Sequence, residues 1–343
     1  MTTKMGVALV GAGMIAKTHV AALSATSRDL QLVYVISRRP EKAVYLADLF
    51  DGDAPKFSSD VALISNDPNI AFTIVATPPS VRIELIRELA TAGKHILLEK
   101  PIGRNTSEAT EVVEICEKAG VKLGVLFQHR VRAPSIAARR YVDSGELGAL
   151  GLVEINVPLW RDQSYYDELG RGTYERDGGG VMITNAIHSI DLALSLAGPV
   201  TQVRAMTATT PLHDMEAEDL ATAGLKFANG ASGVFIASTA MFPHRTEIIR
   251  LHFEKGSLRI DKDGLQIDWR NGDSEYEAAC VPSSPDIPLQ GGKYEWHQAV
   301  IEDFAAAIRD NRPPLVTGRN ALLSHKLIEA IETSSKDGTP INL

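Results

Sequence analysis

The chain has 343 residues and a formal net charge of −8, and 44% of its residues are hydrophobic. This length exceeds the size at which one hydrophobic core usually stops growing, so we expect about two domains, while the negative charge disfavours nucleic acid or an anionic membrane as the main partner. No apolar stretch is long enough to span a bilayer, and two cysteines without metal-ligand spacing predict a cytoplasmic protein that holds no metal.

The first predicted strand, residues 7–10, is a continuous apolar run, which is typical of a parallel strand buried on both faces. It leads into Gly11-Ala12-Gly13-Met14-Ile15-Ala16 and a helical pattern over residues 14–23. A strand, a glycine-rich turn and a helix in this order are the context that a dinucleotide-binding motif needs.

Each position of this motif has a physical role. Gly11 permits the tight turn, and Gly13 lets the backbone approach a pyrophosphate. The small Ala16 allows close packing of helix against strand. Met14 and Ile15 lie where N–H groups and the positive end of the helix dipole face phosphate oxygens. We therefore expect a bound dinucleotide here.

The second predicted strand, residues 32–36, ends at Ser37-Arg38-Arg39. A site that prefers NAD has an acidic residue here, which binds the ribose diol. A hydroxyl and two guanidinium groups instead suit a 2′-phosphate, so we expect NADP in preference to NAD. In the alternative interpretation Arg38 stacks on adenine and Arg39 is a solvated charge, which leaves either cofactor possible.

Strands and helices alternate over about the first 125 residues, the pattern of a doubly wound parallel sheet. Pro40 predicts the start of a helix. Ser80 and Ser107 predict the N-caps of two later helices, which end at Gly93 and near Gly120. The further strands are expected at residues 71–76, 96–98 and 121–127.

Glu99-Lys100-Pro101 follows the strand at residues 96–98, at the edge where open parallel sheets bind ligands. A lysine there can hydrogen-bond a substrate hydroxyl, and its charge favours the alkoxide-like state from which hydride leaves. Together with the glycine motif, Lys100 predicts nicotinamide-dependent hydride transfer, with Glu99 among the cofactor-binding residues. The alternative is an exposed Glu-Lys pair of little consequence.

After residue 127 the pattern changes to longer alternating strands, which predicts a mixed, mostly antiparallel open sheet. Strands are expected from residue 150 onward and at 201–209, 220–227, 231–240 and 248–253. Asn229-Gly230 predicts a hairpin turn, and two helices are expected between about residues 294 and 335. The predicted domains are a dinucleotide-binding domain over 1–127 and a substrate-binding domain over 128–343.

A helix is predicted over residues 181–196, after three successive glycines, and it carries a polar stripe. The stripe consists of Thr184, His188, Asp191 and Ser195. His188 is a candidate for proton transfer, because an imidazole titrates near neutrality. Asp191 could orient that imidazole or cap a neighbouring segment. A structural histidine satisfied by Asp191 is the alternative.

The chain resembles the glucose-fructose oxidoreductase, inositol dehydrogenase and rhizopine-catabolism (Gfo/Idh/MocA) family. The resemblance rests on the glycine motif at Gly11, on Ala76-Thr77-Pro78-Pro79, on Glu99-Lys100-Pro101, and on Gly178-Gly179-Gly180 leading to His188 and Asp191. It covers essentially the whole chain. It implies a Rossmann domain followed by an α/β domain whose open sheet commonly mediates homodimers or homotetramers. It also implies oxidation or reduction at a secondary alcohol of a sugar, sugar acid or cyclitol.

The same resemblance implies roles for single residues. Lys100 corresponds to the catalytic lysine and His188 to the catalytic histidine. Thr77 and Pro78 would line the pyrophosphate and the nicotinamide ribose, and Gln128 would lie near the nicotinamide or the substrate.

Position 184 departs from the family pattern. Many members have an aspartate four residues before the histidine, whereas this chain has Thr184 there with Asn185 beside it. A threonine can hydrogen-bond a substrate hydroxyl but cannot relay a proton as a carboxylate can. The acid and base work is therefore expected to fall on His188 and Lys100.

The segment 160–176 combines aromatic side chains with hydrogen-bond donors, which suits a polyhydroxylated ring. Arg161, Tyr166 and Arg171 are its substrate-binding candidates, beside Lys100, Asn185 and His188 elsewhere. The two arginines could instead bind a carboxylate or phosphate. An aromatic dihydrodiol or keto compound is an alternative substrate, because this segment can also bind a flat ring. A non-catalytic dinucleotide-sensing regulator is the alternative of another class.

Overall fold

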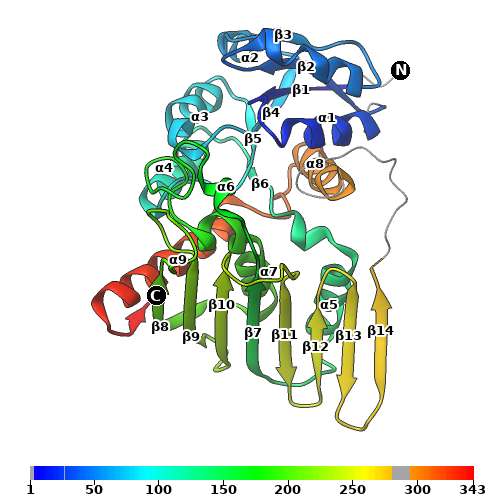
Figure 1. Ribbon diagram of the computed structural model, residues 1–343. Helices are drawn as coiled ribbons and strands as arrows, with labels where there is room; N and C mark the ends of the chain where they lie inside the picture. Colours follow the sequence, from blue (N-terminus) through cyan, green and yellow to red (C-terminus); the bar gives the residue numbers. More distant parts are fainter. Residues whose placement is uncertain (1–3, 27, 280–293) are drawn as a thin grey trace. The chain divides into compact units, whose positions relative to one another are not determined.

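The computed structural model describes residues 4–26, 28–279 and 294–343, which belong to two compact units (Figure 1). As far as its residues are described, the first unit comprises Met1–Gly103, Ser107–Gln128 and Ser283–Ala321. The second unit comprises Arg104–Thr106, His129–Pro282 and Leu322–Leu343.

The first unit contains a six-stranded sheet in which every neighbouring pair of strands is parallel. Its strands are β1 (Met5–Val10), β2 (Leu30–Ile36), β3 (Lys56–Ser58), β4 (Ile70–Val75), β5 (His95–Leu98) and β6 (Leu123–Val125). Their order is β3-β2-β1-β4-β5-β6, so the direction of the order reverses beside β1. The carboxyl ends of β1 and β4 therefore border the crevice where such sheets bind ligands. The doubly wound sheet expected from the sequence is confirmed.

The helices of the first unit are α1 (Ala16–Ala25), α2 (Ala62–Ser65), α3 (Arg82–Thr91), α4 (Thr106–Lys118) and α8 (Tyr294–Arg309). Short 3₁₀ turns cover Pro40–Lys42, Val44–Leu49, Pro79–Val81 and Gln128–Val131. Gly93 and Gly120 have positive φ angles, so both end their helices as predicted.

Pro40 begins a short 3₁₀ helix, so the predicted helix start is present. Two other local predictions at helix starts were wrong. Ser80 does not cap α3, because Pro79 starts a 3₁₀ turn that includes Ser80, and α3 begins only after Val81. Ser107 lies inside α4, which already begins at Thr106.

Helix α8 is encoded late in the chain, yet it packs in the core of the first unit and lies against α1 (Figure 1). Phe304 is 1% exposed, and its ring meets that of Phe72 edge to face with 5.4 Å between centroids. A Cβ on Gly124 would come within 2.6 Å of the Phe304 ring, so the absence of a side chain there makes room for the aromatic ring. In this respect the compact units differ from the domains expected from the sequence, in which both late helices belong to the second domain.

The second unit contains a nine-stranded sheet in the order β14-β13-β12-β11-β7-β10-β9-β8-β15. Its strands are β7 (Leu150–Pro158), β8 (Val200–Ala208), β9 (Leu220–Phe227), β10 (Ser232–Ser238), β11 (Ile248–Phe253), β12 (Gly256–Ile260), β13 (Gly264–Trp269), β14 (Ser274–Ala278) and β15 (Ile341–Asn342). Only β7 and β10 pair in parallel, so the predicted mixed, mostly antiparallel sheet is confirmed. The predicted hairpin turn is also present, with Gly230 at φ +90°.

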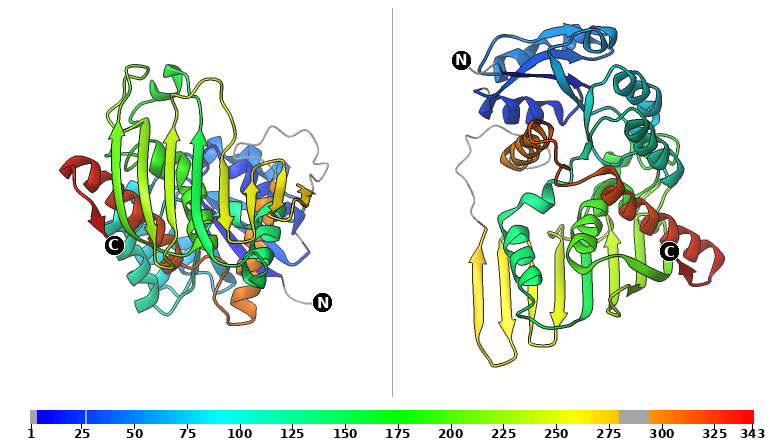
Figure 2. Two further views of the ribbon diagram at one scale, coloured as in Figure 1. Left: turned by 90° about the horizontal axis from the view of Figure 1, so that it is seen from below. Right: turned by 180° about the vertical axis from the view of Figure 1, so that it is seen from behind.

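The helices of the second unit are α5 (Ala133–Ser144), α6 (Gln163–Tyr166), α7 (Ile187–Ala197) and, from Leu322 onward, α9 (Gly318–Asp337). Figure 2 shows α5 and α7 on one face of the nine-stranded sheet, and the opposite face carries no helix of the described residues. One face of this sheet is thus open.

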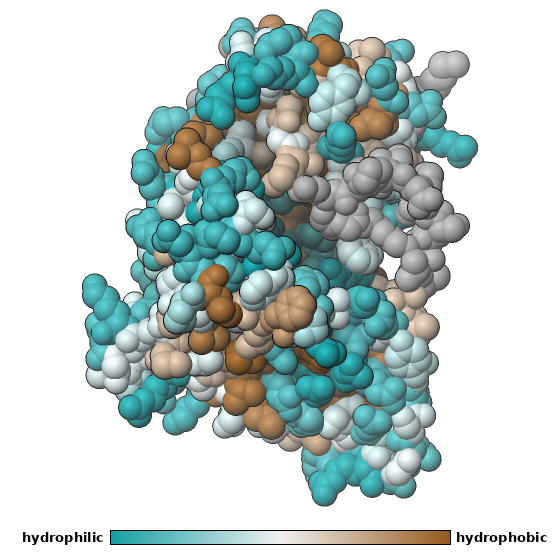
Figure 3. Space-filling model, viewed as in Figure 1, coloured by the Kyte–Doolittle hydropathy of each residue, from teal (hydrophilic) through white to brown (hydrophobic). Residues whose placement is uncertain are grey.

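The visible surface in Figure 3 is mostly hydrophilic, with hydrophobic residues scattered singly or in small groups, as is normal for a folded protein. Within the described residues, no helix combines the length and the hydropathy that crossing a bilayer requires.

Phe304→Ala tests the place of α8 in the core. We expect it to lower the free energy of unfolding by about 3–5 kcal/mol, because it removes a buried ring and leaves a cavity beside Phe72 and Gly124. Equilibrium unfolding in denaturant measures this free energy for the variant and for the parent. Arg309→Ala, at an exposed position of the same helix, should cost less than about 0.5 kcal/mol. Equal effects of the two substitutions would contradict the packing described.

Candidate active site

The turn between β1 and α1 has the geometry expected of a phosphate-binding loop. Gly11 has φ +108°, and a Cβ there would lie 2.7 Å from the backbone of Ala76, so no larger residue fits this turn. Gly13 has open space where its Cβ would lie. Helix α1 then begins after Ile15 without a side-chain cap and with no acidic residue in its first turn. The free N–H groups at its start can therefore face an anion.

The end of β2 offers cations and a hydroxyl but no carboxylate at the position that would bind a ribose diol. Ser37 is half-buried, and its Oγ accepts a hydrogen bond of 3.2 Å from the backbone N–H of Arg39. Arg38 and Arg39 are exposed, and neither is ion-paired to any carboxylate among the described residues. This end of the strand is thus positively charged.

Arg82, at the start of α3, joins two loops of the candidate cofactor site. It is 2% exposed, and its guanidinium donates to the carbonyl oxygens of Thr77 at 2.6 and 3.0 Å, of Glu99 at 2.6 Å, and of Pro101. Burial lowers the pKa of Arg82 to about 10, with Glu99 opposing this shift, so the group stays charged at neutral pH. The sequence analysis missed Arg82, and no local pattern distinguishes it from a surface arginine.

Lys100 comes after β5 and Glu99, and the Lys100–Pro101 peptide bond is cis. Burial lowers the pKa of Lys100, Glu99 opposes this shift, and the neighbouring charge of Arg82 lowers it further. A lysine in these surroundings gives up its proton more readily than one in water, which suits a group that exchanges protons.

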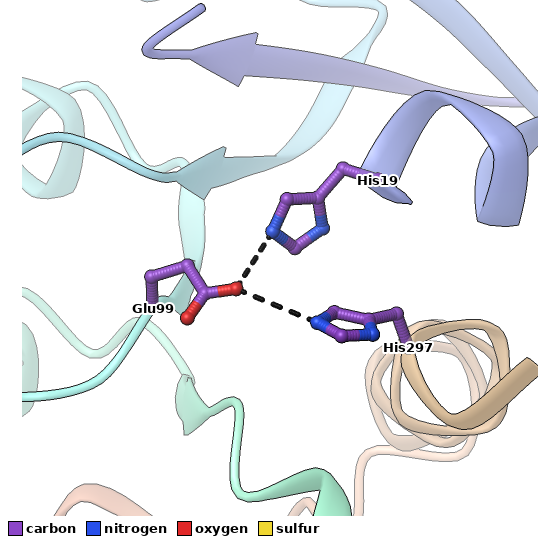
Figure 4. Close-up of side chains that lie close together, drawn as sticks. All are labelled: His19, Glu99 and His297. Carbon is purple, nitrogen blue, oxygen red and sulfur yellow. Dashed lines mark hydrogen bonds and ion pairs between the residues drawn. The ribbon is translucent and has the colours of Figure 1, made fainter. Parts of the chain in front are cut away.

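Glu99 holds the end of β5 through two histidines from distant parts of the chain (Figure 4). Its Oε1 lies 2.9 Å from His19 Nε2 of α1 and 3.8 Å from His297 Nε2 of α8. Burial alone would raise the pKa of Glu99, but His19, His297 and Lys100 lower it by more, to about 2. Glu99 is therefore a carboxylate at every ordinary pH.

These three side chains could also be considered as a metal site, because their ligand atoms all lie within 4.8 Å of one another. A metal-bound histidine almost always donates its second ring N–H to an acceptor. His19 Nδ1 is buried and has no hydrogen-bond partner. The distance of 2.9 Å from His19 Nε2 to Glu99 Oε1 is that of a hydrogen bond, with Nε2 donating to the carboxylate. We therefore interpret the group as a hydrogen-bonded cluster that anchors β5.

In the second unit, Glu218 anchors the start of the helix that carries His188. Its carboxylate accepts hydrogen bonds from the backbone N–H groups of Gly180 at 2.9 Å and Met182 at 3.0 Å. A Cβ on Gly180 would lie 1.8 Å from the carbonyl oxygen of Glu218, and one on Gly178 would lie 2.3 Å from that of Arg104. The glycine run is thus required for close backbone approach.

The predicted helix over 181–196 is split into a π-helical turn, Met182–Ala186, and α7. Regular α-helical spacing therefore holds for His188, Asp191 and Ser195, whereas Thr184 lies in the π turn before them. Asp191 is buried and binds Arg130 in bidentate fashion at 2.6 and 2.7 Å, and it makes no hydrogen bond to His188. Burial raises the pKa of Asp191, although Arg130 opposes this. Ser195 donates to the carbonyl oxygen of Leu192.

Thr184 and Asn185 lie within the π turn, before His188. The Thr184 hydroxyl lies 2.6 Å from the carbonyl oxygen of Gly180 and 3.0 Å from Asn185 Oδ1. His188 is 7% exposed, and its ring stacks on that of His129. His129 was missed by the sequence analysis, although it follows Gln128 directly.

The substrate-binding candidates of segment 160–176 differ in their surroundings. Tyr166 is buried, and its hydroxyl lies 2.6 Å from Thr239 Oγ1. The guanidinium carbons of Arg161 and Arg171 lie 5.2 and 4.2 Å from the centre of the Tyr165 ring. Tyr166 thus belongs to the local core, and the two arginines surround an aromatic ring.

Two family models match the chain. The model described as an oxidoreductase family with an NAD-binding Rossmann fold matches residues 5–127. The GFO/IDH/MocA C-terminal domain matches residues 136–259.

Similar proteins are dehydrogenases. Inositol 2-dehydrogenase from Rhizobium meliloti is 26% identical and matches over 100% of both chains. The structure of the WlbA dehydrogenase from Bordetella pertussis with NADH and UDP-GlcNAcA is 30% identical, with a TM-score of 0.82 over 99% of both chains. The structure of levoglucosan dehydrogenase with NADH is 23% identical, has a TM-score of 0.87 over 99% of both chains, and shows the common fold.

Glu99→Gln tests the charge at the end of β5. Because the pKa of Glu99 is about 2, below the 4.5 of an ordinary glutamate, its charge stabilises the protein above about pH 4.5, and this stability is lost as the pH falls toward 2. We expect the variant to be less stable than the parent at pH 7, with a difference that shrinks between pH 4.5 and 3. Free energies of unfolding measured across this range check it. Glu41→Gln, at an exposed carboxylate, serves as the control and should follow the parent.

Proposed function

Because the chain belongs to the GFO/IDH/MocA oxidoreductase family, we propose that it transfers a hydride between a nicotinamide cofactor and a secondary alcohol or ketone of a sugar, sugar acid or cyclitol. The observation that carries this proposal is Lys100, whose flanking residues are held by Arg82 and by the Glu99 cluster. Family membership supports an enzyme over a sensor.

In the proposed reaction the alcohol loses a hydride from carbon and a proton from oxygen, and becomes a ketone. A bound nicotinamide supplies the hydride acceptor. Lys100 would hydrogen-bond the reacting oxygen and stabilise the negative charge that develops on it. His188 would take up the proton and return it in the reverse direction.

Thr184 and Asn185 can bind substrate hydroxyls but cannot accept the proton, because neither side chain is basic at neutral pH. We therefore propose that they orient the substrate. Arg161 favours a sugar acid within this substrate range, because guanidinium groups pair with carboxylates, whereas Arg171 is already paired with Glu168. Tyr166 would support this segment through the hydrogen bond between its hydroxyl and that of Thr239.

The first domain is an NAD-binding Rossmann fold, and we propose that NADP is preferred to NAD. Ser37, Arg38 and Arg39 support this preference, because a 2′-phosphate would meet two cations and no carboxylate. Gly11, Gly13, Met14 and Ile15 would face the pyrophosphate, while Thr77, Pro78, Glu99, Lys100 and Gln128 would surround the nicotinamide half.

The open face of the nine-stranded sheet supports a homodimer or homotetramer as part of the proposal. Strand register places Leu152, Met206 and Val234 on this one face, where they are 37%, 57% and 52% exposed. Exposed apolar residues on an uncovered face are typical of an interface. We also propose a cytoplasmic location, because the two cysteines of the chain form neither a metal-ligand pattern nor a disulfide framework.

Lys100→Ala tests the chemical step. We expect kcat to fall by about 10²–10⁴-fold, because the developing charge loses its cation, while cofactor affinity stays close to that of the parent. Steady-state kinetics on sugars, sugar acids and cyclitols, with cofactor binding followed by fluorescence, measure both quantities. Lys118→Ala, whose side chain is 80% exposed, should leave both unchanged. Unchanged turnover in the Lys100 variant would remove that residue from the mechanism.

Ser37→Asp tests the cofactor preference. A carboxylate at this position should repel the 2′-phosphate and bind the ribose diol, so the ratio of kcat/KM with NADP to that with NAD should fall by about tenfold or more. Ser107→Asp adds the same charge at an exposed position of α4 and should leave the ratio unchanged. An unaltered ratio in the Ser37 variant would mean that this residue does not contact the ribose.

A further inference from the structure

His129 lies against the histidine to which we assign proton transfer. The two rings are stacked, with 4.6 Å between centroids and 21° between planes. His129 is 8% exposed and His188 is 7% exposed, so each ring covers a face of the other from water. His129 comes from the 3₁₀ turn Gln128–Val131, and His188 comes from the first turn of α7.

The edge of the His129 ring is held by Arg132. His129 Nε2 lies 2.5 Å from Arg132 Nη2. A guanidinium has only donors, so Nε2 must be the acceptor, and the proton of the neutral ring is on Nδ1. That atom faces Glu247, whose Oε1 lies 3.7 Å away. His129 is thus a neutral ring of one defined tautomer.

The charges around the two rings balance. Glu247 accepts from Arg132 Nη1 at 2.5 Å, and the same carboxylate faces His129 Nδ1 at 3.7 Å. Arg130 is neutralised by its bidentate pair with Asp191. The carboxylate of Asp261 lines a small cavity with His129, Arg132 and Glu247, and its charge is neutralised by Arg259 at 2.8 Å.

We propose that His129 is a positioning residue for the reaction: its neutral ring fixes the plane of His188, and the Arg132–Glu247 pair keeps a net positive charge away from that ring. The proposal rests on the proton-transfer role of His188 in the proposed function. Stacking on a neutral ring lets His188 gain a proton without repulsion from a second cation. The stack restricts rotation of the His188 ring about its χ angles, which favours one direction of proton transfer.

Three substitutions separate the parts of this arrangement. His129→Asn keeps a carbonyl acceptor for Arg132 but removes the ring. His129→Phe keeps a flat ring in the stack but has no acceptor for Arg132. Glu247→Gln leaves the rings in place and leaves the charge of Arg132 uncompensated. His252→Asn is the matched control, because His252 pairs with Glu154 and Ser257 on the sheet, outside this cluster.

The experiment combines a pH titration of labelled histidines by NMR with kcat/KM measured across the same pH range. In Glu247→Gln we expect the midpoint of the His188 signal to move to lower pH by about one unit, because the uncompensated cation disfavours protonation. The limb of the kcat/KM profile governed by His188 should move with it. His129→Asn should change the ring-current shift of His188 and lower kcat about ten- to a hundredfold, with cofactor affinity retained. His129→Phe should restore most of that loss, and His252→Asn should match the parent.

The two readouts distinguish the possible failures. A His188 signal that matches the parent in both Glu247→Gln and His129→Asn overturns the inference, whatever the turnover. Equal kcat in the parent and in His129→Asn also overturns it. The variants could shift the His188 signal as expected while the parent oxidises no alcohol with either cofactor. That result would count against the proposed function and would still support the contact between His129 and His188.

Discussion

The buried charge at the carboxyl end of β5 is the constraint on which the first unit's candidate site depends. A carboxylate taken out of water is costly unless neighbouring groups compensate it, and Glu99 has His19 and His297 for this purpose. Arg82 is a buried positive charge. Its guanidinium donates hydrogen bonds to backbone carbonyl oxygens on both sides of Lys100, which compensate for the lost water. Moving either group would leave a buried charge without partners, so the chain around Lys100 has one well-defined path.

The second unit uses the same principle around His188. Glu218 binds the N–H groups at the start of the π turn, and Asp191 binds Arg130 at the side of α7. The hydrogen bonds of both acidic groups go to Arg130 and to backbone N–H groups, while the His188 ring is stacked on that of His129. Buried ion pairs are a modest source of stability, because desolvation offsets much of their attraction. Here they specify which way a helix faces.

The position of α8 shows why chain order and compact units can differ. Its buried residues recur at helical spacing, and they include His297 and Phe304. Phe304 fills the space over Gly124, and His297 completes the cluster at Glu99. One late helix therefore contributes to both the hydrophobic core and the electrostatics of the unit that begins the chain.

The sequence by itself determined the features that depend on residues close together in the chain. The Gly11 turn, the apolar parallel strands, the Asn229-Gly230 hairpin and the place of Lys100 after a buried strand are all local, so pattern and spacing were enough to predict them. Only the tertiary structure decided the partners of those residues. His19 and Glu99 are 80 positions apart, and Arg130 and Asp191 are 61 apart, and no periodicity links such pairs. The π turn before His188 is a related case: Glu218, distant in sequence, binds the N–H groups at its start, and an α-helical spacing does not anticipate it. Local conformation follows from nearby side chains, whereas the compensation of buried charge is settled only when the whole chain has folded.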